Sequence, residues 1–160
     1  MALRFRRITG KNYHECMELS VRDDQANCFY FNSSRPNMMS LAEAYVFGNR
    51  SQVLAICDGK TMVGALFYTP AAKTGSAWLT RLMIDKRYQG KGYGRKAMEM
   101  LIRRVSRQGA KRLGLSYEPH NKQAETLYLS LGFKPSEKAH GQTVAWLDLS
   151  PSEPRVRKRA

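Results

Sequence analysis

The sequence has no apolar run near the roughly 18 residues that a membrane-spanning helix needs, and no apolar block follows the basic residues at its start. We therefore expect neither a transmembrane segment nor a secretory signal. With 160 residues, the chain is long enough for one domain with a core of its own. We expect a cytoplasmic protein in which residues 1–150 form a single domain and residues 151–160 form a basic, disordered tail.

Cysteine and histidine are equally scarce. The three cysteines, Cys16, Cys28 and Cys57, are far apart and include no CxxC pair, so neither a disulfide framework nor a zinc site is indicated. The three histidines are also scattered, with no second ligand at metal-binding spacing. We expect three reduced thiols and no bound metal.

Acidic residues are the third scarcity. The chain has 13 Asp and Glu against 27 Lys and Arg, which gives a net charge of +14. The last ten residues carry +3 of this charge, so residues 1–150 carry the remaining +11. A field of this sign favours anionic partners, which include nucleic acid, anionic lipid and phosphorylated small molecules.

Hydrophobic periodicity predicts one mixed α/β domain, with a sheet faced by helices. Thr9 is expected to cap the first helix, and the pair Asp58-Gly59 indicates a hairpin turn. Residues 21–37 have no clean period and predict a loop with at most one short helical turn. The expected strands are 3–9, two hairpin arms within 52–70, 76–85, 111–117, 133–137 and 143–149, and the expected helices are 11–20, 38–48, 92–108 and one capped by Asn121 and closed by Gly132.

The stretch RYQGKGYGRK at residues 87–96 stands between a predicted strand and a predicted helix. A P-loop pattern and a dinucleotide-binding fingerprint both fail here, because each needs glycine where Arg95 stands. The first turn of a helix nevertheless binds anions through backbone N–H groups that lack intrahelical partners. Glycines at this point let a pyrophosphate approach the backbone itself. A glycine-rich turn with a solvated basic flank is the alternative.

A second stretch decides between these interpretations. LTRLMIDKRYQGKGYG, with Gln89-x-x-Gly92-x-Gly94, resembles the acetyl-CoA motif of the GNAT superfamily of N-acetyltransferases. NKQAETLYLSLGF at 121–133 resembles that family's second signature at every fixed position. The resemblance covers residues 50–149 well and the first 50 by element order. It implies a mostly antiparallel central sheet of about six or seven strands, flanked by about four helices.

The resemblance also implies how acetyl-CoA would bind. The backbone of Leu82, Met83 and Ile84 would pair with the pantetheine arm of the cofactor, and Asn121 would contact the cofactor or fix the local turn. The pyrophosphate would be held by the loop ahead of the helix, which consists of Gln89, Gly90, Lys91, Gly92, Tyr93, Gly94 and Arg95. No metal is implied.

For catalysis, Tyr128 stands where the family has its general acid, which would protonate the departing thiolate and contribute about 10²–10⁴ in rate. A core tyrosine on the apolar helix face is the alternative for Tyr128. The amine would attack the thioester directly after losing a proton. Glu118 is the leading candidate for the base, although it is equally well read as a solvated carboxylate, and His120 is an outside candidate.

The residues of the motif resemble those of bacterial spermidine/spermine acetyltransferases. This resemblance leads us to expect a small primary amine as acceptor. Thr80 stands where such relatives are expected to carry an acid, which leaves polyamine specificity open. Asp23, Asp24 and Phe31, in the loop that the family places over the substrate, are the other expected contacts, unless the two acids merely start a helical turn. Acetylation of a protein or peptide amine, a homodimer, and nucleic-acid binding through the basic tail are kept as alternatives.

Overall fold

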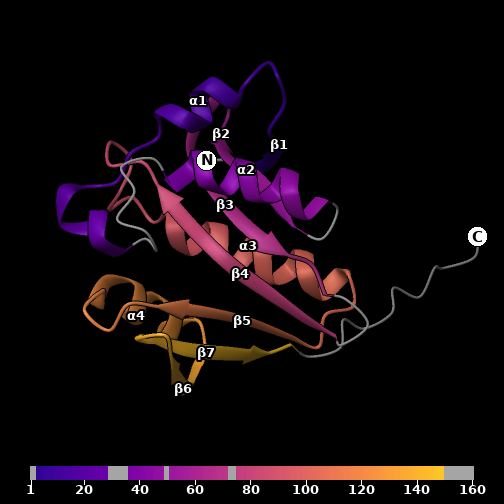
Figure 1. Cartoon of the computed structure of the whole chain (residues 1–160), viewed down its shortest axis with the longest axis vertical. Helices are drawn as coiled ribbons and strands as arrows, with labels where there is room; N and C mark the ends of the chain where they lie inside the picture. Colours follow the sequence, from indigo (N-terminus) through magenta and orange to yellow (C-terminus); the bar gives the residue numbers. More distant parts are fainter. Residues whose placement is uncertain (1–2, 29–35, 49–50, 72–74, 150–160) are drawn as a thin grey trace, which may run out of the picture.

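The structure, a computed structural model, describes residues 3–28, 36–48, 51–71 and 75–149. The strands form a seven-stranded sheet in the order β1-β2-β3-β4-β5-β7-β6 (Figure 1). Every neighbouring pair is antiparallel except β4 and β5, which are parallel. The strands are β1 Leu3–Arg7, β2 Gln52–Asp58, β3 Thr61–Thr69, β4 Ser76–Ile84, β5 Arg112–Tyr117, β6 Lys134–Ala139 and β7 Gln142–Asp148.

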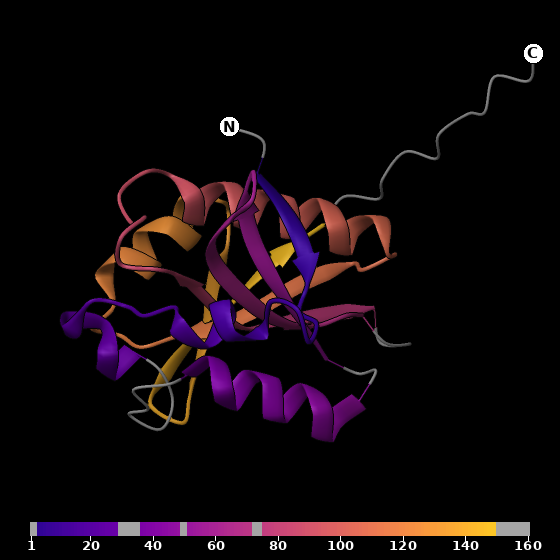
Figure 2. The same ribbon diagram turned by 90° about the horizontal axis from the view of Figure 1, so that it is seen from above.

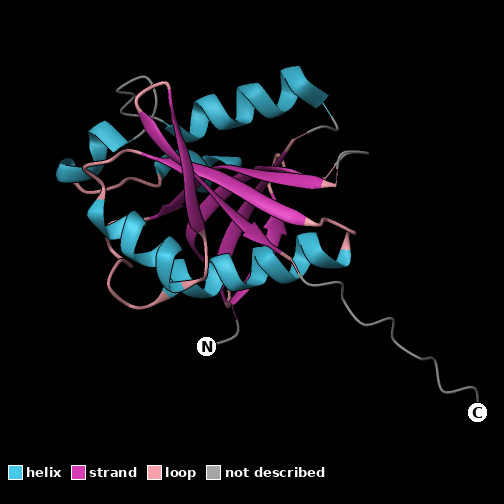
Figure 3. Ribbon diagram, turned by 90° about the horizontal axis from the view of Figure 1, so that it is seen from below, coloured by secondary structure: helices cyan, strands magenta, loops and turns pink. Residues whose placement is uncertain are grey.

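Helices cover both faces of this sheet, so the molecule has three layers (Figures 2 and 3). The helices α1 and α2 lie on one face, and α3 and α4 lie on the other. The expected mixed α/β fold with a mostly antiparallel sheet is confirmed. The helices are α1 Tyr13–Glu18, α2 Pro36–Phe47, α3 Tyr93–Arg107 and α4 Lys122–Ser130, with a short 3-10 helix η1 Asp23–Cys28 between α1 and α2.

The sheet separates two apolar clusters. The larger cluster packs the buried face of α3, which includes Ala97, Met98 and Leu101, against the strands. The smaller cluster holds Cys16 and Leu19 against the opposite face of the sheet. The helical period that the sequence shows over residues 92–108 therefore reflects one stripe of α3 that is buried on the sheet.

The feature of the sheet that matters most for function is the point where β4 and β5 separate. These two strands pair only between residues 76–79 and 112–115, and beyond that point they diverge (Figure 1). Gly114 lies just before the separation, and a Cβ atom there would come within 2.6 Å of the indole rings of both Trp78 and Trp146. Only glycine fits at this position, because the two rings meet across β5.

Two local expectations need correction. The helix α1 begins at Tyr13, and Asn12 rather than Thr9 stands at its N-cap position. Asn12 folds back onto the end of β1, where its Oδ1 accepts a hydrogen bond from the backbone N–H of Thr9 at 2.7 Å. The hairpin loop lies one residue later than expected, because Asp58 still pairs with Thr61. The loop is therefore Gly59 and Lys60, and Gly59 takes the positive φ of +59° that such a turn requires.

Candidate active site

A cavity of about 870 Å³ lies where β4 and β5 diverge. Its walls are the second half of β4, the loop that leads into α3, the end of β5, and the inner face of α4. Gln25 of η1 and Glu43 of α2 also contribute to the lining. The sequence-predicted residues in its lining are Thr80, 82–84, 89–90, 92–95, Asn121 and Tyr128.

The glycine loop ends in an open helix N-terminus at this cavity. Gly92 is the N-cap of α3, with φ of +79°, and it offers no side chain to cap the helix. The first bond of the helix runs from the N–H of Lys96 to the carbonyl of Gly92. The N–H groups of the preceding turn are left for an anionic ligand. The anion site itself stays a prediction, and the local geometry leaves these N–H groups free for it.

The protein leaves open space around Gly94. A Cβ atom at Gly94 would meet the protein only at 3.7 Å from Leu127 and 3.9 Å from Ile84, which are ordinary contacts. The φ angle of Gly94 is not in the left-handed region. The fold itself therefore tolerates a larger residue here, and the close approach of a ligand remains as a reason for glycine.

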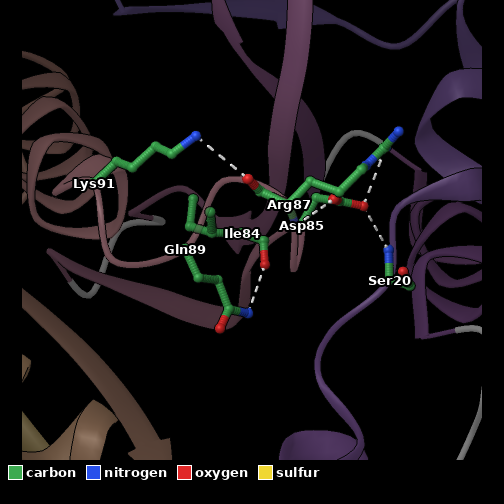
Figure 4. A network of polar contacts seen from close by, with 6 residues as sticks. All are labelled: Ser20, Ile84, Asp85, Arg87, Gln89 and Lys91. Carbon is green, nitrogen blue, oxygen red and sulfur yellow. Dashed lines mark hydrogen bonds and ion pairs between the residues drawn. The ribbon is translucent and has the colours of Figure 1, made fainter.

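A buried carboxylate fixes this loop to the neighbouring segments (Figure 4). Asp85, which is fully buried, accepts hydrogen bonds from the backbone N–H of Ser20 at 3.0 Å and from Nε of Arg87 at 2.7 Å. Burial alone would raise the pKa of Asp85, but these hydrogen bonds outweigh it and hold that pKa below its usual value. Asp85 is therefore ionised at neutral pH and ties the segment before η1 to the end of β4.

Gln89 makes a second tie. Its Nε2 donates to the carbonyl of Ile84 at 2.9 Å and to Oε1 of Gln25 in η1 at 2.8 Å. Its Oε1 is buried and has no hydrogen-bond partner among the described residues. Lys91 does not line the cavity: its Nζ contacts the carbonyl of Arg87 at 3.4 Å and lies over the ring of Tyr88.

Tyr128 is buried on the inner face of α4, at 8% exposure, and its side chain borders the cavity. Its ring lies 5.8 Å from the rings of both Tyr117 and Phe133. Burial raises the pKa of Tyr128 to about 12, so its hydroxyl keeps its proton at neutral pH. Asn121 caps α4 as expected, because its Oδ1 accepts from the N–H of Ala124 at 3.1 Å.

Some expected site residues lie away from the cavity. Glu118 is not in its lining, and its Oε1 accepts a hydrogen bond from Nε2 of Gln142 at 3.0 Å. Gln142 in turn accepts from Oγ of Ser116 at 2.6 Å, and both of these residues do line the cavity. Asp23 and Asp24 start η1 outside the lining, and Asp24 pairs with Arg22. Phe31 lies outside the described residues.

The structure adds an ion pair that sequence reasoning missed. Glu43 of α2 and Arg81 of β4 both line the cavity and contact one another at 2.6 Å. A signal for both residues was present in the sequence: each is the single charged residue of an otherwise apolar or neutral element. Nothing in the sequence alone could have paired them, because 38 positions separate them.

Among the described residues, no helix is long and apolar enough to span a membrane. No group of three or more His, Cys, Asp or Glu residues in the described ranges is placed to hold a metal ion.

Comparisons with known proteins identify the family of this chain. The profile of the acetyltransferase (GNAT) family matches residues 18–133. The spermine/spermidine N(1)-acetyltransferase of Bacillus subtilis (strain 168) is 29% identical over 140 residues, which cover 84% of this chain and 89% of the relative.

Solved structures show the same fold. An acetyltransferase from Thermus thermophilus superposes with a TM-score of 0.75 at 22% identity, over 93% of this chain and 98% of that one. A spermidine N-acetyltransferase from Vibrio cholerae, solved with CoA and spermine, gives a TM-score of 0.75 at 16% identity, over 93% and 96% of the two chains. Because the family profile spans most of the chain and includes both the glycine loop and the Asn121–Phe133 signature, this chain belongs to the GNAT family of N-acetyltransferases.

Proposed function

We propose that this protein transfers an acetyl group from acetyl-CoA to a primary amine of a small molecule by direct attack. The observation that carries the proposal is a single cavity that borders both the open N-terminus of α3 and the buried hydroxyl-bearing residue Tyr128. An anion site and a proton donor on one cavity are what transfer from an anionic thioester requires.

The cofactor would lie along two backbone segments. The N–H groups at the start of α3, from Gly92 to Arg95, would hold the pyrophosphate, and Arg95 adds a positive side chain at the cavity. The backbone of residues 82–84 is available to the pantetheine arm, because β4 has left its pairing with β5 before this point. Acetyl-CoA, when bound, would supply the thioester carbonyl that the amine attacks.

Tyr128 would act as the general acid. As the amine nitrogen bonds to the carbonyl carbon and the C–S bond breaks, the Tyr128 hydroxyl would give its proton to the departing sulfur. Its raised pKa of about 12 keeps that proton in place until the thiolate forms, although it also makes Tyr128 a weaker acid.

Glu118 remains our proposed base, and its position makes the role indirect. The amine would lose its proton to a water molecule in the cavity, and Glu118, which lies outside the lining, would take up that proton from water. The side chains of Ser116 and Gln142 connect Glu118 to the lining. An amide does not readily relay a proton, so water rather than Gln142 would carry it.

The acceptor is proposed from the relatives. The curated relatives are named for spermine and spermidine, which supports a small amine, polyamine-like or other, in this chain. Thr80 lines the cavity and would contact such an amine. Asp23, Asp24 and Phe31 stay proposals as substrate contacts, and the two aspartates would need η1 to shift toward the cavity.

The test is a direct assay. Purified protein, acetyl-CoA and a panel of small amines should release free thiol, and calorimetry should detect acetyl-CoA binding without any amine. A protein that fails to bind acetyl-CoA would show this proposal to be wrong.

A further inference from the structure

The ion pair of Glu43 and Arg81 lies inside the cavity but has no part in the chemistry proposed above. We propose that Arg81 binds an oxyanion of the acceptor, so that the acceptor is a primary amine that also carries a carboxylate or a phosphate. This inference rests on the proposed function, because it concerns which amine the same cavity accepts.

The guanidinium group of Arg81 is held rigidly in the cavity wall. Its Nη1 donates to Oε2 of Glu43 at 2.6 Å and to Oγ of Ser40 at 3.2 Å, and its Nη2 donates to Oε1 of Glu43 at 3.2 Å. Its Cζ atom also lies 5.6 Å from the ring centre of Phe67. The group is thus fixed from α2 and from β3, and its side chain is only 11% exposed.

The donors that remain on Arg81 form a matched pair. A guanidinium group has five N–H donors in one plane, and three of them serve Glu43 and Ser40. The two others, Nε–H and the second N–H of Nη2, lie along one edge of the group and point the same way. Neither has a hydrogen-bond partner among the described residues. Two parallel N–H groups on one edge are the arrangement that binds a carboxylate or phosphate with two hydrogen bonds.

A local irregularity of the sheet gives Arg81 this position. The register of β3 and β4 shifts between Phe67 and Tyr68, which pair with Arg81 and Leu79. Thr80 is therefore an extra residue that forms a bulge on β4. The bulge lies at the point where β5 leaves β4, and it places Arg81 opposite Phe67 in the cavity lining.

The charge of the cavity agrees with such an acceptor. Glu43 is the one carboxylate among the described lining residues, and both of its oxygens are engaged by Arg81. The sequence has no Asp or Glu between Asp24 and Glu43, so residues 29–35 bring no further carboxylate. A polyamine carries several positive charges, which this lining would not balance. In an amine that carries a carboxylate or phosphate, the negative group balances the positive charge of the amine within the same molecule.

The experiment compares acceptors that differ only in the anion. Steady-state kcat/KM is measured for propylamine against β-alanine, for pentylamine against 5-aminopentanoate and for 2-aminoethanol against 2-aminoethyl phosphate, and spermidine is measured as the polyamine. We expect at least one oxyanion-bearing amine to exceed its uncharged partner by about 10- to 100-fold, which is the effect of hydrogen bonds to a charged group, mainly through KM. Whether the phosphate or a carboxylate gives the larger increase in kcat/KM identifies the preferred oxyanion, and either result supports the inference.

Variants locate the preference at Arg81. Arg81→Gln should abolish it and should raise kcat/KM for spermidine, because Glu43 then loses its partner. Glu43→Gln should keep the preference and lower the rate with spermidine further. Arg107→Gln, an exposed position on α3, should leave all acceptors unchanged. If Arg81→Gln fails to fold, the double variant Arg81→Gln/Glu43→Gln, which leaves no unpaired charge, should lose the preference in its place.

The outcomes separate this inference from the proposed function. If acetyl-CoA does not bind and no amine is acetylated, the proposed function itself fails. If the wild-type protein acetylates the uncharged amines with a kcat/KM equal to or above that of the oxyanion-bearing amines, only this inference is overturned. A preference that survives in the folded variants without Arg81 would overturn it too.

Discussion

At the scale of single residues, Tyr128 carries a hydroxyl group that packing alone does not require. A phenylalanine would fill the same space between Tyr117 and Phe133, so the hydroxyl group is the part that needs a reason. We expect Tyr128→Phe to lower kcat by about 10²–10⁴, because the thiolate then leaves without a proton donor. Acetyl-CoA affinity, measured by calorimetry, should stay nearly unchanged.

The matched control for this change is Tyr45→Phe. Tyr45 is 89% exposed on α2, so the loss of its hydroxyl should alter neither kcat nor KM. An unchanged kcat in Tyr128→Phe would remove Tyr128 as the acid and leave it as a core residue.

Asp85 makes a prediction about stability and pH. Its pKa is lower in the folded protein than in the unfolded chain, so its ionised form stabilises the fold above the unfolded pKa of about 3.9, and this stabilisation is lost as the pH falls below that value. Asp85→Asn should lower the free energy of unfolding by about 1–3 kcal/mol at pH 7, because it loses hydrogen bonds to a charged acceptor.

Urea unfolding of the wild type and of Asp85→Asn, repeated from pH 7 down to pH 3, provides the measurement. The difference between the two proteins should shrink toward the acidic end. A difference that stays constant with pH would mean that the charge of Asp85 contributes nothing, and that only its shape matters to the contacts with Ser20 and Arg87.

At the scale of elements, the N-terminus of α3 contains one glycine that the backbone conformation requires and one that it does not. Gly92 is required by its positive φ, whereas Gly94 is not. We expect Gly94→Ala to leave the melting temperature unchanged or to raise it, because alanine favours the helix by up to about 1 kcal/mol. The added methyl group should raise KM for acetyl-CoA about tenfold or more, since it occupies the approach of the pyrophosphate.

Gly10→Ala is the control for Gly94→Ala. Gly10 is exposed, a Cβ atom added there would meet no atom within 4 Å, and its φ is not positive, so this change should leave KM for acetyl-CoA unaltered. A Gly94→Ala protein that is stable and binds acetyl-CoA normally would exclude a cofactor path over this residue.

The elements also show how far sequence reasoning reaches. The hairpin, α3 and the cap of α4 at Asn121 follow from neighbours in the chain, and these were predictable. The bulge at Thr80 and the pairing of Glu43 with Arg81 depend on contacts between strands and helices that are distant in the sequence. The position of Glu118 near the second signature suggests a base, but its side chain accepts a hydrogen bond from Gln142 and lies outside the cavity lining. The residues predicted from the two motifs therefore mostly lie in the cavity lining, whereas Glu118, Asp23 and Asp24, which were predicted from sequence position alone, do not.

At the scale of the whole molecule, the positive charge has more than one use. The anion binding proposed at the start of α3 would explain only a local part of the +14, because Arg81 and Arg95 are the basic residues among the described cavity lining. Such a field attracts any polyanion weakly and with strong salt dependence. Low-salt binding to nucleic acid by itself would therefore be no evidence of a second function.

Removal of residues 151–160 tests both the domain boundary and the source of that attraction. We expect the shortened protein to keep its melting temperature and its kcat/KM, because residues 1–150 are proposed to form the whole domain. The tail carries four basic residues, and each phosphate contact contributes about 0.9 to the slope of log affinity against log salt on duplex DNA. If all four make phosphate contacts, gel shifts at several salt concentrations should show this slope falling by about 3.6. Binding that survives the deletion with the same slope would place the nucleic-acid contacts on the folded body, and a lowered melting temperature would extend the domain past residue 150.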